Sequence, residues 1–133
     1  MRLARVLLWM NSAIFALYGI AFALFPEPMA IFVTGSIPES TSALIDMRAT
    51  YGGLCLAVGV VFALLACKAA MVRTGVVVLA IVLGGMAGTR ALGIILDGDP
   101  NPLMNLYLAT EILVALLAIW ALHGLPPDCD ADG

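Results

Sequence analysis

Charged residues are scarce in this sequence. Only 11% of its 133 residues are Asp, Glu, Lys or Arg, whereas 63% are hydrophobic and the mean hydropathy is +1.10. Because soluble domains carry about a quarter of charged residues, this composition excludes an ordinary soluble domain and predicts a membrane protein. The formal net charge is -3, and no run of Lys or Arg is present that would neutralise a series of phosphates. Nucleic-acid binding is therefore not expected.

Cysteine and histidine are rare as well. Cys55, Cys67 and Cys129 share no spacing typical of metal ligands, which argues against a zinc site or a disulfide framework. His123 is the single histidine, so the spans hold no pair of histidines for haem. Nucleotide-binding loops and nucleophile motifs are also missing. The sequence therefore predicts no metal, no cofactor and no catalytic residue.

Four long apolar stretches are present, and they predict an all-α membrane protein with one four-span domain over residues 1–133. At about 1.5 Å per residue, each stretch is long enough to cross the ~30 Å hydrocarbon core of a bilayer. The stretches cover about residues 6–25, 43–67, 74–96 and 103–122.

Helix-boundary signals flank these stretches. Pro38 and Glu39 suit the first turn of the helix that contains the second stretch. Asn101 and Pro102 are typical of an N-cap and a first helical position, and Gly124 follows the last stretch as a stop signal. We therefore expect the second helix to begin at about residue 38 and the fourth to begin at residue 102.

The segments outside the four spans are short. Residues 29–33 form an apolar patch that is too short to cross a bilayer, so we expect it to lie along the interface between spans one and two. Arg2, Arg5 and residues 21–23 supply an imperfect signal peptide, but the apolar core is longer than usual, which favours an uncleaved first span. Residues 125–133 are expected to form a short acidic, disordered tail.

Positive charges lie on one side of the predicted spans. Arg2 and Arg5 precede the first span, and Lys68 and Arg73 lie between the second and third, whereas the other two loops carry only acidic residues. By the positive-inside rule, both termini are predicted to be cytoplasmic. The four spans are expected to form a helix bundle.

Small residues recur at four-residue spacing on two of the spans, a pattern that lets helix backbones approach closely. We expect packing within the bundle, with a dimer interface as the alternative for Gly84 and Gly88. Gly52 and Gly53, beside Tyr51, leave room for a ligand or for an entering side chain. The two stripes are Ala80, Gly84 and Gly88 on the third span and Gly59, Ala63 and Cys67 on the second.

Charged side chains inside the spans fall at similar depth. A charge at the bilayer centre costs roughly 2.5–3.5 kcal/mol, so it must be paired or used. Glu111 lies nine residues after Pro102 and Arg90 lies seven residues before Asp97. At about 1.5 Å per residue these positions are ~13 Å and ~10 Å below the outer boundary. Arg48, on the second span, lies ~8 Å below the same boundary and is expected to join them.

Further polar residues occur at this depth. Arg48 and Tyr51 are expected to share one helix face at i+3, and Tyr107 shares a face with Glu111 at i+4. The complete set of candidate site residues is Arg48, Tyr51, Arg90, Glu111, Tyr107, Tyr18 and Asp46.

Two interpretations of this polar layer stay open. In the first, Arg90 and Glu111 form a structural ion pair within the membrane, and Arg48 extends outward to the head groups. In the second, the layer lines a small outward-facing cavity that receives an amphiphile or a small anion. Two guanidinium groups against one buried carboxylate would leave a positive surplus there unless Asp46 balances it.

Three elements of the sequence resemble a known family. They are Asp46-Met-Arg48-Ala-Thr-Tyr51-Gly52-Gly53-Leu54, Gly88-Thr-Arg90-Ala-Leu-Gly93 leading to Asp97-Gly98, and Ala109-Thr-Glu111. Over roughly residues 5–122 the chain resembles domain of unknown function 4345, a family of small four-span membrane proteins. The resemblance implies a bacterial inner-membrane location and a four-helix bundle, and it brings no assigned activity.

Three classes of function remain. The first is a non-enzymatic membrane protein that binds a lipid-like or small anionic ligand, or serves as an accessory subunit, through the polar layer. Its expected partners are the lipid bilayer and either further copies of the chain or another membrane protein. The second class is a small proton-coupled transporter, although such four-span exporters use an unpaired glutamate. The third is an enzyme acting on a membrane-dissolved isoprenoid, sterol or quinone, for which Glu111 has no second carboxylate or histidine suitably placed beside it.

Overall fold

The computed structural model describes residues 1–125, which form helices and connecting loops without any strand. Four helical segments in this part of the chain are long and apolar enough to span a membrane, and they are Arg2–Leu24, Thr41–Cys67, Ala69–Asp97 and Pro102–His123. The prediction of an all-α fold with four such helices is therefore confirmed. Of the predicted acidic tail, residues 126–133 lie outside the described residues, and so does Cys129.

The helices follow one another with short connections. The second membrane-length segment is a continuous run of α3, a π-helix and α4, and a short 3₁₀-helix leads into α5. The bounds are α1 Arg2–Leu24, α2 Pro26–Thr34, α3 Thr41–Met47, π-helix Arg48–Leu54, α4 Cys55–Cys67, 3₁₀-helix Ala69–Met71, α5 Val72–Asp97 and α6 Pro102–His123.

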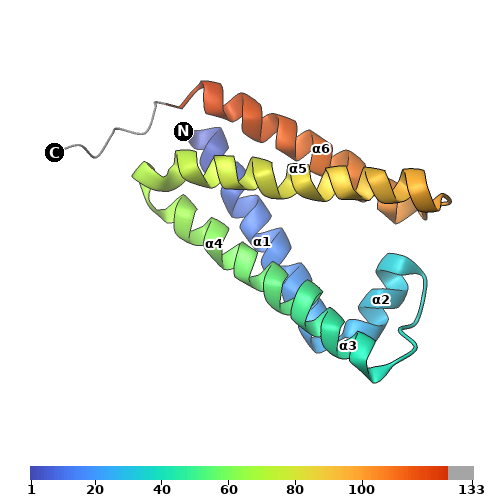
Figure 1. Cartoon of the computed structure of the whole chain (residues 1–133). Helices are drawn as coiled ribbons and strands as arrows, with labels where there is room; N and C mark the ends of the chain where they lie inside the picture. The colour runs from blue at the N-terminus through green and yellow to red at the C-terminus, as the bar shows by residue number, and fades with distance from the viewer. Residues whose placement is uncertain (126–133) are drawn as a thin grey trace.

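The spans are arranged as two pairs of consecutive helices. In Figure 1, α1 lies along α4, and α5 lies along α6. The two pairs meet at the end of the molecule that holds the N-terminus and diverge toward the other end, where α2 and α3 are found. Leu8, Phe62, Leu79 and Ala118, one from each span, are all 0% exposed and belong to one hydrophobic core. The core thus joins the pairs at their common end.

Small residues hold the backbones of α1 and α4 together. A Cβ atom on Gly59 would lie 2.8 Å from the backbone nitrogen of Ala16, which is too close for any side chain. The Ser12 hydroxyl donates a 2.8 Å hydrogen bond to the Gly59 carbonyl across the same contact. The backbone of Ala23 fills the space beside Gly52 in the same way. Gly52 therefore accommodates a neighbouring helix rather than a ligand.

Gly84 and Gly88 of α5 lie on a different face from the one predicted. A Cβ atom added to either would have no atom within 4 Å, and both residues are exposed. The expectation that they pack within the bundle is therefore wrong, although Ala80 of the same stripe does pack against the core. The face that α5 buries consists mostly of larger side chains, which removes more apolar surface from solvent. Its residues are Val72, Gly75, Val76, Leu79, Leu83 and Ala87.

The helix starts show one further difference from the sequence prediction. On α6 the Asn101 side chain accepts a 2.9 Å hydrogen bond from the Met104 backbone, and Pro102 is in the first turn, as predicted. On α3, by contrast, the helix starts at Thr41 and not at Pro38, because the Ser40 hydroxyl accepts a hydrogen bond from the Ala43 backbone. A serine side chain that satisfies an unpaired helix amide is a strong N-cap, so the two residues before it stay outside the helix.

The apolar patch that follows the first span forms α2. This helix ends at Gly35, which adopts a φ of 76°. Ala30 and Val33 are buried, whereas Phe32 is 68% exposed. The Asn101 side-chain amide donates a 2.9 Å hydrogen bond to the Val33 carbonyl. Helix α2 is therefore tied to the loop between α5 and α6 at the end where the two pairs diverge.

Candidate functional site

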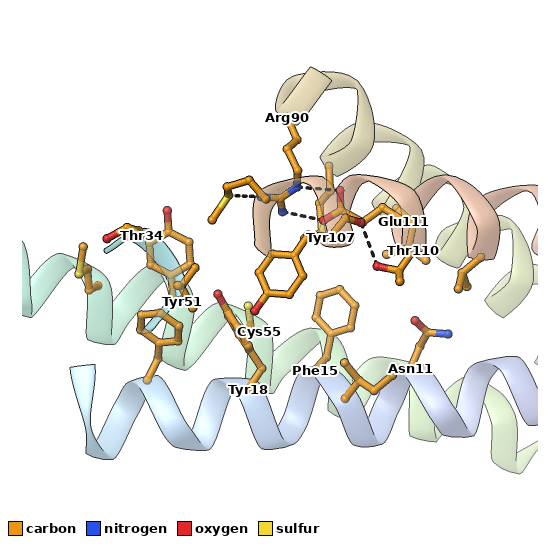
Figure 2. A pocket seen from close by; sticks show the side chains of 18 of the residues that line it. Asn11, Phe15, Tyr18, Thr34, Tyr51, Cys55, Arg90, Tyr107, Thr110 and Glu111 are labelled. Carbon is orange, nitrogen blue, oxygen red and sulfur yellow. Dashed lines mark hydrogen bonds and ion pairs between the residues drawn. The ribbon is translucent and has the colours of Figure 1, made fainter. Parts of the chain in front are cut away.

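A cavity of about 360 Å³ lies between the two helix pairs. Side chains from α1, α2, α3, the π-helix, α4, α5 and α6 line it. Most of its walls are apolar, and the polar side chains in Figure 2 point into it from both sides. Its polar and sulfhydryl lining residues are Asn11, Tyr18, Thr34, Tyr51, Cys55, Arg90, Tyr107, Thr110 and Glu111. Five of the seven candidate site residues are thus brought together.

Arg90 of α5 and Glu111 of α6 form a bidentate salt bridge at one wall of the cavity. The Arg90 Nε donates to Glu111 Oε2 at 3.0 Å, and Arg90 Nη2 donates to Oε1 at 2.6 Å. The side chains are 20% and 8% exposed, respectively. Two parallel charge-assisted bonds fix the guanidinium plane as well as its position. Arg90 and Glu111 therefore neutralise each other within the lining.

Two more residues of α6 hold the Arg90 guanidinium. Its Nη1 lies 3.1 Å from the sulfur of Met104, and its Cζ lies 5.2 Å from the centre of the Tyr107 ring. The sequence analysis did not single out Met104. Its signal is the spacing of Met104, Tyr107 and Glu111 at intervals of three and four, which places all three on one helix face. Arg90 is therefore enclosed by a single face of α6.

Arg48 and Asp46 do not line the cavity. Arg48 is exposed, and its Nη1 donates a hydrogen bond to the carbonyl of Ala23 at the end of α1. Asp46 is exposed too, and its Oδ1 accepts a 3.5 Å hydrogen bond from the hydroxyl of Thr50. The charged lining residues are Arg90 and Glu111, so the positive surplus expected from two arginines is not found there.

The π-helix explains why Arg48 and Tyr51 separate. Both residues lie in the π-helix Arg48–Leu54, whose hydrogen bonds span five residues rather than four. Each turn is wider, so residues three apart no longer share a face as they do in an α-helix. Tyr51 therefore lines the cavity while Arg48 reaches the outside of α1.

An aromatic row forms another wall. The ring centres of Tyr18 and Phe22 are 4.8 Å apart, and those of Phe22 and Tyr51 are 5.1 Å apart. Cys55, which was not among the site residues predicted from the sequence, is the first residue of α4 and also lines the cavity. Figure 2 shows the side chains of Tyr18, Cys55 and Tyr107 pointing toward one another across the cavity.

Some polar side chains of the lining already form hydrogen bonds within the protein, and others do not. The side chains of Asn11, Thr34 and Thr110 donate to carbonyls of their own helices. Among the described residues, no hydrogen bond involves the phenol hydroxyl of Tyr18, Tyr51 or Tyr107. Within residues 1–125 no three His, Cys, Asp or Glu side chains are grouped so that they could hold a metal ion. The phenols are thus the groups that remain available for a ligand.

Comparison with known proteins places these elements in a family. The family model described as domain of unknown function (DUF4345) matches residues 3–122, nearly the whole chain. No curated protein and no solved structure matches the chain. The Arg90–Glu111 salt bridge and the cavity residues fall inside the matched range, and so do the four spans apart from the terminal residues Arg2 and His123. The chain therefore belongs to the DUF4345 family.

Proposed function

We propose that this protein is a non-enzymatic, multi-pass membrane protein that binds a lipid-like ligand in the cavity between its two helix pairs. The observation that carries the proposal is the cavity itself, which combines apolar walls with a small cluster of polar groups. Binding sites for small molecules have this composition, and a volume of about 360 Å³ lies at the lower end of their range of roughly 300–1,000 Å³. Such a cavity holds part of a lipid and leaves its chain in the bilayer.

The charges of the lining favour a lipid-like ligand over a small anion. Glu111 neutralises Arg90 through two hydrogen bonds, and Arg48 is bonded to the Ala23 carbonyl outside the cavity. A free anion would have to displace a carboxylate that is already well bonded. The same pairing does not favour a proton-coupled transporter, which relies on an available carboxylate.

The distribution of positive charge supports an orientation for this cavity. Arg2 and Arg5 lie at the start of α1, and Lys68 lies in the connection between α4 and α5. Figure 1 shows both of these places at the end of the molecule where the helix pairs meet. With that end in the cytoplasm, both termini are cytoplasmic, the four spans form a bundle across a bacterial inner membrane, and the cavity lies in the outer half of the bilayer. In this orientation α2 lies at the outer interface, and the Arg90–Glu111 salt bridge is an intramembrane ion pair.

Native mass spectrometry of the protein in mild detergent tests the proposal. Val114 lines the cavity, whereas its neighbour Leu113 is 57% exposed on the outside of α6. Val114→Phe adds the volume of a ring to the cavity and is expected to remove a co-purifying lipid. Leu113→Phe makes a comparable change on the outer face and is expected to retain it. Equal lipid content in both variants, with folding intact, would contradict the proposal. The same spectra report the number of subunits, and hence any homo-oligomer.

A further inference from the structure

The hydrogen-bonding groups in the cavity identify the kind of head group that it accepts. We infer that the cavity recognises an uncharged head group bearing a hydroxyl or carbonyl oxygen, through the phenol hydroxyls of Tyr18 and Tyr107. This inference rests on the proposed function and goes beyond it, because it states which head-group chemistry lets the cavity distinguish one membrane-dissolved amphiphile from another.

The charges in the cavity lining cancel. The charged residues of the lining are Arg90 and Glu111, which form a bidentate salt bridge, so the lining is neutral overall. A phosphate or carboxylate head group would bring an unbalanced negative charge into this apolar space, and an ammonium would bring a positive one. Either charge loses its hydration on entry and finds no free partner of opposite sign. An uncharged head group avoids that cost.

Two phenol hydroxyls of the lining are available to bind such a head group. Asn11, Thr34 and Thr110 are engaged with backbone carbonyls of their own helices. The hydroxyls of Tyr18 and Tyr107 have no hydrogen bond to any described residue, and they face each other from α1 and α6 beside the Cys55 thiol. A phenol both donates and accepts a hydrogen bond. Two facing phenols therefore match a ligand oxygen placed between them.

A row of aromatic rings offers a surface for the apolar part of the ligand. Phe22 lies between Tyr18 and Tyr51 in a row of rings with centres 4.8 Å and 5.1 Å apart. Phe15 continues the apolar wall from the same face of α1. A hydrocarbon chain or a flat ring gains dispersion contacts along this row. The apolar part of the ligand thus has a surface next to the two phenols.

The test uses Cys55 as a reporter of occupancy. Because the chain has three cysteines, Cys67→Ser and Cys129→Ser leave Cys55 as the one thiol, and it lies in the cavity wall. The protein is placed in phosphatidylcholine nanodiscs, and the rate of its alkylation by N-ethylmaleimide is followed by intact mass. Decanol, methyl nonyl ketone, decyl phosphate and decyltrimethylammonium are added at equal mole fraction in the bilayer. We expect the two uncharged probes to slow alkylation at lower mole fraction than either charged probe.

Tyrosine variants test the role of the phenols. Tyr18→Phe and Tyr107→Phe each remove one hydroxyl and keep the ring, so the mole fraction of decanol needed for half-protection is expected to rise roughly two- to tenfold, the net worth of one neutral hydrogen bond. Thr89→Val is the matched control, because it also removes one hydroxyl, in a residue outside the cavity lining whose hydroxyl donates to carbonyls of its own helix. Protection is therefore expected to stay unchanged.

The possible failures are distinguishable. Stronger protection by a charged probe, or unchanged protection in both Tyr18→Phe and Tyr107→Phe, would overturn the inference about the head group and leave lipid binding standing. Absence of protection by every probe, together with equal lipid content in Val114→Phe and Leu113→Phe, would overturn the proposed function itself.

Discussion

The Arg90–Glu111 salt bridge is the strongest polar interaction that the structure shows between α5 and α6, and its removal gives a quantitative prediction. Glu111→Gln keeps the size of the side chain and leaves the Arg90 guanidinium without its counter-ion. Removing one partner of a fully buried pair costs roughly 3–5 kcal/mol. The Arg90 side chain is 20% exposed, so the pair is not fully buried, and we expect the free energy of unfolding to fall by about 2–4 kcal/mol.

A double-mutant cycle separates the salt bridge from the other contacts of Arg90. Arg90→Gln also loses the contacts with Met104 and Tyr107, so it is expected to cost at least as much as Glu111→Gln. Once either charge has gone, the other has no partner to lose. The double variant is therefore expected to be no less stable than Arg90→Gln alone, with a coupling energy at least equal to the cost of Glu111→Gln, about 2 kcal/mol or more.

The assay is equilibrium unfolding in mixed micelles of rising dodecyl sulfate content, followed by tryptophan fluorescence and circular dichroism. Arg48→Gln combined with Glu111→Gln serves as the control cycle, because Arg48 lies outside the cavity and contacts the Ala23 carbonyl. That control is expected to be additive within about 0.5 kcal/mol. Additive losses for Arg90 and Glu111 would refute the claim that the two charges stabilise each other.

Three further predictions use the same unfolding assay. Gly59→Ala is expected to lower the free energy of unfolding by about 1–3 kcal/mol, because the added Cβ atom would collide with the backbone of α1. Gly84→Ala, which has open space around it, is expected to be neutral or stabilising. Equal changes in the free energy of unfolding for the two variants would contradict the packing described. Asn101→Asp keeps the helix cap and removes the donor to the Val33 carbonyl. Asn101→Ala removes the cap as well, and the cap contributes about 1 kcal/mol to the free energy of unfolding. Asn101→Asp is therefore expected to destabilise the protein less than Asn101→Ala. Ser12→Ala removes the donor to the Gly59 carbonyl and is expected to cost about 0.6 kcal/mol, so a cost near zero would show that this bond contributes nothing.

Much of the fold is predictable from the sequence because its signals are local. Apolar length identifies the four spans, and the Asn101 N-cap sets the start of α6 correctly. Depth measured from Pro102 and Asp97 brings Arg90 and Glu111 to one level, and in the structure the two side chains meet. Each of these inferences requires only a constant rise per residue along a regular helix.

The structure differs from the sequence predictions where a helix is irregular, or where the rotation of a helix about its axis decides which residues are buried. The π-helix changes the angle around the helix axis between Arg48 and Tyr51, and no spacing of residues in the sequence predicts a π-helix here. The outward direction of Gly84 and Gly88 depends on which face of α5 meets the other helices, and the helix is too uniformly apolar for its pattern to show that face. The contribution of Met104 depends on a contact between two helices, which a single helix does not encode.

The pairing of consecutive spans has a consequence for the synthesis of the protein. Helices α1 and α4 are packed through Ser12 and Gly59, both of which precede the Ala69–Met71 connection in the chain. The contacts between α5 and α6 are all made after it. The first hairpin is therefore synthesised before the second, and each hairpin is closed by contacts between its own residues. The cavity, like the hydrophobic core shared by all four spans and the Asn101–Val33 hydrogen bond, forms when the two hairpins join.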